Sequence, residues 1–93
     1  MVAKGTSTHE TTRKVVAAIG AHARQRREGL GLTLREVSLR AGLSLPYIAN
    51  LEKARGNPTL DTLVRLSDAL DIALPALVAV PADIADVLDP PQR

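Results

Sequence analysis

Residues 33–52 read TLREVSLRAGLSLPYIANLE and contain the local signals from which two short helices and the turn between them can be predicted. Thr33 and Glu36 have the spacing of a capping box, in which each side chain accepts a hydrogen bond from the other residue's backbone N–H. A helix is therefore predicted to begin at about Leu34. It should end at Gly42, because glycine adopts the left-handed conformation without a steric penalty.

A second short helix is predicted directly after this turn. Ser44 is its expected N-cap, and Pro46 falls in its first turn, where a missing backbone donor does no harm. Ile48 and Leu51 are its expected buried face. Two such helices joined by a tight turn form a helix-turn-helix unit, whose second helix enters the major groove of DNA while the first contacts the backbone.

Helical patterns continue on both sides of this unit. Apolar residues recur at helical spacing from Val15 onward, and that helix should end near Gly29. Thr59 is expected to cap a fourth helix, Pro75 to start a short fifth one, and a last turn or two to run over residues 82–88. The sequence thus predicts an all-α fold of five helices with a short C-terminal extension.

The predicted helices divide the chain into an arm, one domain and an extension. Residues 1–11 are polar and are expected to form a flexible N-terminal arm, although Ser7 and Glu10 could cap a helix start. Residues 12–80 hold the helix-turn-helix domain. Residues 81–93 are expected to form an extension, a short helix followed by a frayed tail.

The composition excludes several classes of protein. A chain of 93 residues makes one domain, and without cysteine it has neither disulfides nor thiolate zinc sites. The apolar run at 73–82 is about half the roughly 20 residues that cross a bilayer, and the N-terminus lacks the apolar core of a signal peptide. We therefore expect a cytoplasmic protein with no membrane partner.

The charges are distributed unevenly along the chain. Residues 1–58 carry ten Lys and Arg against four acidic residues, a formal charge of +6. Residues 59–93 carry two basic residues against six acidic ones, a formal charge of −4. The first part suits a polyanionic partner, and the second repels one.

Several motifs of one family occur at the expected separations. They are Arg27-x3-Gly31-Leu32-Thr33, Ser38, Gly42, Ile48, Leu51, Glu52 and Asn57-Pro58-Thr59-Leu60. With them, the segment 19–77 closely resembles the Cro/CI-type, or XRE, class of bacterial and phage regulators. The resemblance covers 59 of the 93 residues. It implies a lambda-repressor-like DNA-binding domain and a sequence-specific transcriptional regulator, not an enzyme.

The resemblance also implies roles for individual residues. Arg27 is expected to pair with Glu52, which would tie the first helix to the end of the recognition helix. Leu45 and Pro46 stand where relatives often carry glutamine, and Asn50 can hydrogen-bond adenine, so an A/T-containing half-site is favoured. The expected base-contacting residues are Ser44, Leu45, Pro46, Tyr47 and Asn50. For Tyr47 a second interpretation is open, in which its ring packs on the preceding helix.

Basic and hydroxyl side chains beside the recognition helix are expected to contact phosphates. They are Arg24, Arg26, Thr33, Arg35, Arg40, Lys53 and Arg55. For each arginine the alternative is a solvated surface position without a DNA contact.

Three positions depart from the family pattern. Ala54 replaces a usual glycine, so either Ala54 is strained or the recognition helix runs longer. Leu34 replaces a frequent glutamine, which removes one expected phosphate contact. Ala23 is smaller than the common aliphatic residue and is expected to loosen the junction with the first helix.

One recognition helix reads only a few base pairs, so regulators of this kind usually bind as two-fold dimers. The apolar residues expected at the dimer interface are Leu74, Leu77, Val78, Val80, Ile84, Val87 and Leu88. The alternative is that these residues cover the open end of the monomer's own core.

Together these features predict a homodimer that binds a short palindrome in double-stranded DNA, with repression the favoured direction. An antitoxin or a restriction-modification controller would use the same domain. The alternative function is a protein-interaction module that keeps the fold without specific DNA binding. His9 and His22 have no third ligand at suitable spacing and no cofactor motif is present, so we expect no metal, no cofactor and no small-molecule ligand.

Overall fold

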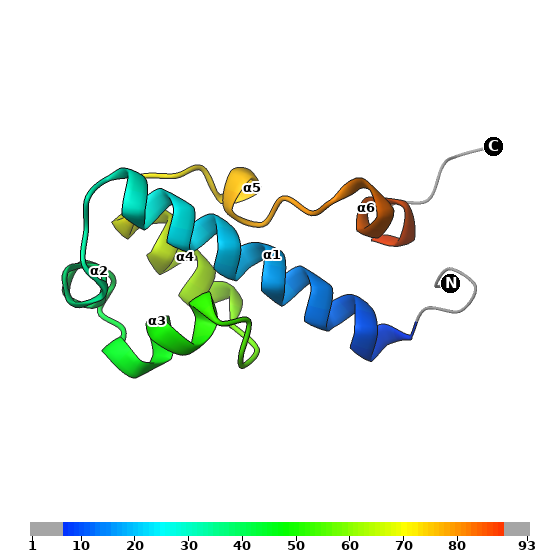
Figure 1. Cartoon of the computed structure of the whole chain (residues 1–93), viewed down its shortest axis with the longest axis horizontal. Helices are drawn as coiled ribbons and strands as arrows, with labels where there is room; N and C mark the ends of the chain where they lie inside the picture. The colour runs from blue at the N-terminus through cyan, green and yellow to red at the C-terminus, as the bar shows by residue number, and fades with distance from the viewer. Residues whose placement is uncertain (1–6, 89–93) are drawn as a thin grey trace.

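The computed structural model describes residues 7–88, with the side chains of residues 7–85. All regular elements in this range are helices, which confirms the predicted all-α class. They are α1 (Thr8–Gly29), α2 (Leu34–Ala41), α3 (Leu45–Glu52), α4 (Leu60–Ala69), α5 (Leu74–Leu77) and α6 (Ala82–Leu88) (Figure 1). In the part of the chain described, none of these helices combines the length and the apolar character that a membrane crossing requires.

Polar caps fix where three of the helices begin. The Thr33 hydroxyl accepts a hydrogen bond from Glu36 N–H at 3.0 Å, and the Glu36 carboxylate accepts one from Thr33 N–H at 2.9 Å. Ser44 caps α3 and Thr59 caps α4 through their hydroxyl groups. Each cap satisfies a backbone donor that has no partner inside the helix, so these helices begin where the sequence predicts.

The first helix begins before residue 12. The Ser7 hydroxyl accepts a hydrogen bond from Glu10 N–H at 3.0 Å and so caps α1. Residues 8–11, which polarity alone assigns to the arm, are therefore the first turn of α1. The rest of the predicted arm, residues 1–6, lies outside the described residues.

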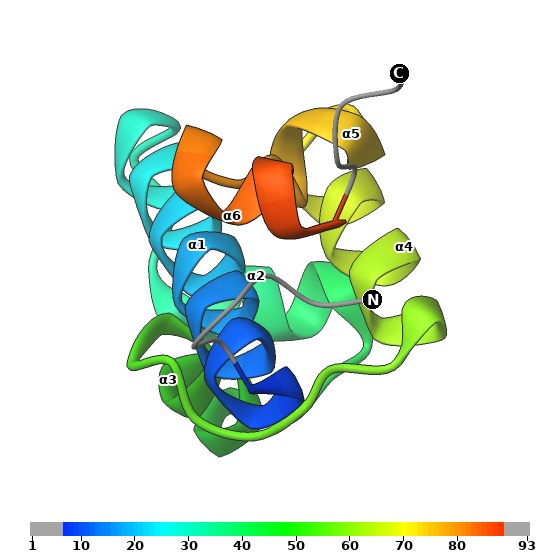
Figure 2. The same cartoon turned by 90° about the vertical axis from the view of Figure 1, so that its right-hand side faces the viewer.

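An aliphatic core lies between α1 and the helices around it. α3 lies on one side of α1, and α5 and α6 lie on the other (Figures 1 and 2). α2 packs against both α3 and α4. The residues of the core cluster are Val16, Ile19, Ala23, Val37, Ala41, Ile48, Leu51, Leu66, Ala69, Leu70 and Leu77.

α1 and α3 approach each other closely at Gly20. A Cβ atom at this position would lie 2.2 Å from the carbonyl oxygen of Leu51. Ala23, one turn further along α1, is 2% exposed. Ala23 is therefore buried in the core cluster, and its burial gives no sign of the loosened junction predicted from its size.

Much of the C-terminal apolar surface covers the core of the same chain. Leu77 is fully buried and Ile84 is 3% exposed, so neither offers side-chain surface to a second copy. This arrangement corresponds to the alternative in which the apolar residues close the monomer. The other residues of the predicted dimer set are Leu74, Val78 and Val80, which are half-buried, and Val87 and Leu88, whose side chains lie outside the described residues.

Candidate nucleic-acid interface

The third helix presents one face to the core and the other to solvent. Ile48 and Leu51 are 1% and 2% exposed. α3 itself lies at an edge of the molecule (Figure 1). The predicted base-contacting residues are Ser44, Leu45, Pro46 and Asn50, which are exposed, and Tyr47, which is half-buried. The outward face of α3 is thus open to a partner that fits a single helix.

Tyr47 combines features of both interpretations drawn from the sequence. Its residue is half-buried, which is consistent with partial packing of the ring. Among the described residues, no hydrogen bond engages its hydroxyl group, so this group remains available to a partner.

A three-bond turn sets the position of α3 relative to α2. Gly42 has φ 67°, and its N–H donates to the Ser38 carbonyl at 3.0 Å. Leu43 N–H donates to the same carbonyl at 3.2 Å, and the Ser38 hydroxyl donates to the Leu43 carbonyl. Because both ends of the turn are bonded to Ser38, the angle between the two helices is closely constrained.

An ion pair ties the end of α3 to α1. Arg27 Nε lies 2.7 Å from Glu52 Oε2, and Arg27 Nη2 lies 2.9 Å from Glu52 Oε1. The third guanidinium nitrogen donates to the Leu32 carbonyl at 3.0 Å. The two side chains are only 14% and 8% exposed, and donation to the Glu52 carboxylate raises the pKa of Arg27. A bidentate pair in this setting fixes orientation as well as distance.

The C-terminus of α3 closes in a Schellman motif. Ala54 N–H donates to the Leu51 carbonyl, and Arg55 N–H donates to the Asn50 carbonyl, both at 2.9 Å. Ala54 has φ 62°, a left-handed conformation that glycine usually occupies in this motif. Of the two alternatives from the sequence, the structure therefore has a strained Ala54, and α3 does not run longer.

Four of the predicted phosphate-contacting side chains stand free in solvent. They are Arg35, Arg40, Lys53 and Arg55. Within residues 7–85, no ion pair or side-chain hydrogen bond engages any of them. Their charges are therefore available to an anionic partner.

Two further members of the predicted set are only weakly engaged. Arg24 lies 3.3 Å from Glu28 in an exposed pair one turn apart, and such pairs contribute about 0.3–0.5 kcal/mol. The Thr33 hydroxyl accepts from Glu36 N–H, which leaves its own proton to donate. A phosphate could engage either residue at little cost.

The Arg26 side chain points to the end of α4 and is hydrogen-bonded there. Its Nε donates to the Leu70 carbonyl at 2.9 Å, and its Nη2 donates to the Asp71 carbonyl at 2.7 Å. These carbonyls lie at the C-terminal end of α4, where Asp71 has φ 49°. Arg26 thus closes α4 within the chain, and two of its donors are already used there.

Two residues position α3 and the segment after it in ways that the sequence does not predict. Gly20 admits the backbone of α3, and Arg13 on α1 donates hydrogen bonds to the segment that follows α3. A glycine and an arginine inside a helix carry no local signal of a contact more than 30 residues away. Neither role could be found from spacing alone.

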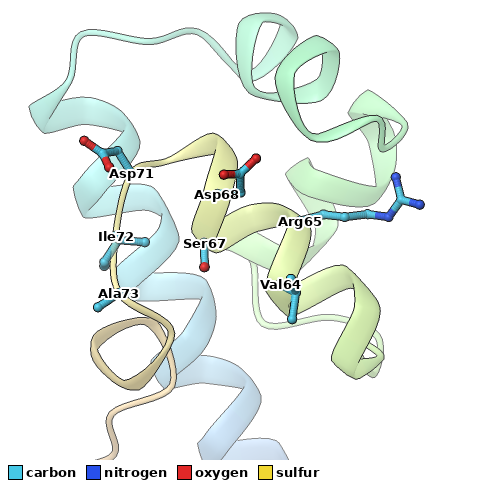
Figure 3. Close-up of a pocket in the computed structure, with 7 residues that line it drawn as sticks. All are labelled: Val64, Arg65, Ser67, Asp68, Asp71, Ile72 and Ala73. Atoms are coloured by element: carbon cyan, nitrogen blue, oxygen red, sulfur yellow. The ribbon is translucent and has the colours of Figure 1, made fainter.

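A surface depression lies beside α4, formed by residues outside the helix-turn-helix unit. It has a volume of 570 Å³ and lies between α4 and the segment leading to α5 (Figure 3). It is lined by Val64, Arg65, Ser67, Asp68, Asp71, Ile72 and Ala73, and the Arg65 guanidinium is paired with Asp61. Its two carboxylates would repel a polyanion, so it is not part of the candidate DNA surface. Among residues 7–88, no three metal-binding side chains are gathered as a site.

Comparison with known proteins agrees with this geometry. The family model HTH_3, described as helix-turn-helix, matches residues 24–77. An uncharacterized HTH-type transcriptional regulator, y4dJ of Sinorhizobium fredii, is 48% identical over 56 residues, which cover 60% of this chain and 71% of the relative.

Two solved structures resemble the chain in both fold and sequence. The restriction-modification controller protein C.AhdI from Aeromonas hydrophila has a TM-score of 0.65 and 27% identity, covering 67% of this chain and 94% of the controller. SinR, a master regulator for biofilm formation solved in complex with DNA, has a TM-score of 0.60 and 30% identity, covering 63% of this chain and 95% of SinR.

Proposed function

The chain belongs to the helix-turn-helix family HTH_3, and we therefore propose that it is a sequence-specific transcriptional regulator that binds double-stranded DNA through α3. The observation that carries the proposal is the exposed face of α3, which is fixed to α1 by the Arg27–Glu52 pair and flanked by cations that no other described residue pairs with. SinR, 30% identical, has been solved with DNA, which supports the same role here. The matching family and relative are helix-turn-helix regulators, so the chain is not an enzyme.

The chemistry of α3 favours a half-site that contains A/T pairs. Asn50 is exposed and can form paired hydrogen bonds with adenine in the major groove. Leu45 is 37% exposed and can contact a thymine methyl group, whereas Pro46 has neither side-chain donor nor acceptor. Phosphate contacts from the free cations around α3 would supply affinity without sequence preference.

We further propose that the regulator acts as a homodimer on a short palindrome. One helix contacts too few base pairs for specificity, and a two-fold dimer places two such helices about 34 Å apart on successive major grooves. Of the apolar residues predicted at the dimer interface, the half-buried Leu74, Val78 and Val80 have side-chain surface that could contribute to the contact.

Repression is the proposed direction of regulation. A dimer bound over a promoter excludes polymerase and needs no additional activating surface. The antitoxin and restriction-modification controller roles remain within this proposal, since C.AhdI, a controller, is 27% identical. A cytoplasmic location follows from the proposal, because bacterial DNA lies there.

Titration of a random duplex with the protein at several salt concentrations tests DNA binding. We expect log affinity to fall linearly with log salt, by about 0.9 for each phosphate contacted. Selection of bound sequences from a random pool should then give a palindrome, and sedimentation with that duplex should give two chains per site. Absence of binding at low salt would overturn the proposal in favour of a protein-interaction module.

A further inference from the structure

The segment that joins α3 to α4 has an unusual backbone. Ala54 and Gly56 have φ values of 62° and 81°, so two left-handed residues lie within three positions. Between and beside them are Arg55 and Lys53, whose side chains are exposed. The Schellman hydrogen bonds hold Ala54 and Arg55, whereas among the described residues no backbone–backbone hydrogen bond engages Gly56 or Asn57, so contacts from another element can hold this part of the segment.

Arg13 supplies these contacts from α1. Its Nη2 donates to the Gly56 carbonyl at 2.8 Å and to the Asn57 side-chain oxygen, and its Nη1 lies 3.4 Å from the Ala54 carbonyl. No carboxylate within residues 7–85 pairs with this guanidinium. Among the described residues, the Arg13 side chain therefore bonds only to the joining segment.

The two carbonyls that Arg13 contacts lie on either side of Arg55. Fixing the orientation of the Ala54 and Gly56 carbonyls also fixes the direction in which the Arg55 side chain leaves the backbone. A planar guanidinium can bond several oxygens at once, whereas a lysine ammonium on a flexible stem lacks this fixed geometry. The contact therefore makes use of a property specific to arginine.

We propose that Arg13 is a positioning residue of the DNA interface, which holds the joining segment so that Lys53 and Arg55 meet the phosphates beside the groove entered by α3. The inference rests on the proposed function and extends it to a part of α1 that precedes residue 24, where the family match begins. In this role Arg13 acts through the two cations and does not itself touch DNA.

A double-mutant cycle on DNA binding tests this role. The cycle combines Arg13→Gln with the pair Lys53→Gln and Arg55→Gln, and affinity for one duplex is measured across a salt series. In the wild-type background, Arg13→Gln should weaken binding and reduce the salt slope by about 0.9 for each phosphate that the two cations no longer reach. In the background that lacks both cations, it should change neither the affinity nor the slope.

Lys14→Gln is the matched control for charge. Lys14 is exposed on the same helix, and no hydrogen bond or ion pair engages its side chain among the described residues. Its effect on binding should be the same in both backgrounds. Arg13→Lys keeps the charge but lacks the planar, forked donor geometry of the guanidinium, so it should lower the salt slope. If Arg13 instead contacted a phosphate directly, Arg13→Lys would retain most of the slope.

The folded state of each variant is checked by its thermal melting and by exchange of the Arg55 amide hydrogen. Faster exchange at Arg55 in a folded Arg13→Gln or Arg13→Lys protein is the expected DNA-independent result. Equal losses of affinity for Arg13→Gln in both backgrounds, or unchanged binding by a folded variant, would overturn the positioning role and leave the proposed function intact. Failure of the wild-type protein to bind any duplex would overturn both.

Discussion

Gly20 of α1 lies directly against the backbone of Leu51 in α3, where an added Cβ atom would be 2.2 Å from the Leu51 carbonyl oxygen. Two helices can approach this closely only where one of them has no side chain. Seven residues further along α1, Arg27 binds Glu52, the residue after Leu51. The position of the recognition helix thus depends on a backbone contact and an ion pair from the same supporting helix.

Gly20→Ala should destabilise the fold. The new methyl group must displace the backbone of α3, and overpacking of this kind typically costs about 1–3 kcal/mol. The higher helix propensity of alanine offsets at most about 1 kcal/mol. Urea denaturation measures the change, with Gly29→Ala as the control, because nothing lies within 4 Å of a Cβ atom there. Equal stability of the two variants would contradict the close contact.

Removal of one partner of the Arg27–Glu52 pair should be costly. Glu52→Ala leaves the guanidinium of Arg27, which is 14% exposed, without its carboxylate, and such a change typically costs about 3–5 kcal/mol. The double variant Arg27→Met with Glu52→Leu should lose less stability, since no charge is then left buried. Arg24→Ala, which breaks only an exposed pair, should stay within about 0.5 kcal/mol of wild type.

If Glu52→Ala proves no more damaging than Arg24→Ala in the same denaturation series, the pair does not hold the helix. The double variant separates two causes of instability. A loss of stability as large as that of the single variant would point to packing, and a smaller loss would point to the unpaired charge.

Acid should weaken the fold partly through the capping box of α2. The hydrogen bond that the Glu36 carboxylate accepts from the Thr33 N–H is the main cause that lowers the pKa of Glu36. A carboxyl group with a lower pKa in the folded state contributes stability above its unfolded value, about 4.3 for glutamate, and loses it as the pH falls through the folded pKa. Glu36→Gln should therefore show a smaller loss of unfolding free energy between pH 7 and pH 3 than wild type does. If Glu36→Gln and wild type lose the same unfolding free energy between pH 7 and pH 3, Glu36 does not contribute to the destabilisation by acid.

Local chemistry made the helix-turn-helix predictable. Thr33, Ser44 and Thr59 each mark a helix start through a bond to a residue three positions on, and Gly42 marks the turn through its own φ angle. Such signals extend over only a few residues and can be recognised without any knowledge of the fold. The exposed face of α3 then follows from the burial of Ile48 and Leu51.

Contacts between distant segments were not predictable in the same way. Arg13 and Arg26 bond carbonyls that lie 41 to 45 residues away, and any exposed arginine on α1 would look the same in the sequence. Leu77 and Ile84 have the apolar character of an interface, but whether they face their own core or a second chain depends on how α5 and α6 pack on α1. The charge of Arg26 predicts a phosphate contact, but nothing in the sequence indicates its hydrogen bonds to the carbonyls at the end of α4.

Ala54→Gly should stabilise the protein. Ala54 has φ 62°, and a left-handed conformation costs a residue with a Cβ atom about 1–2 kcal/mol. Glycine removes this strain, but the greater entropy of its unfolded chain costs roughly 0.5–1 kcal/mol of stability, so the net gain should be about 0–1.5 kcal/mol. Ala49→Gly, inside α3, should instead destabilise by about 1 kcal/mol. Denaturation in urea gives both values, and a loss of stability at position 54 would show that the strain is absent.

Asn50→Ala and Arg55→Ala should affect DNA binding in different ways. Asn50 lies on the outward face of α3, so its loss should relax selection at one base pair in each half-site at a cost of about 1–3 kcal/mol on the preferred sequence. Arg55 follows α3 and is free of partners among the described residues, so its loss should weaken all duplexes alike and reduce the salt slope by about 1. Sequence selection with each variant, followed by salt titration on the selected and on a random duplex, distinguishes the two roles. Unchanged base preference in Asn50→Ala would remove Asn50 from the reading surface, and a loss of affinity restricted to one sequence in Arg55→Ala would contradict a phosphate contact.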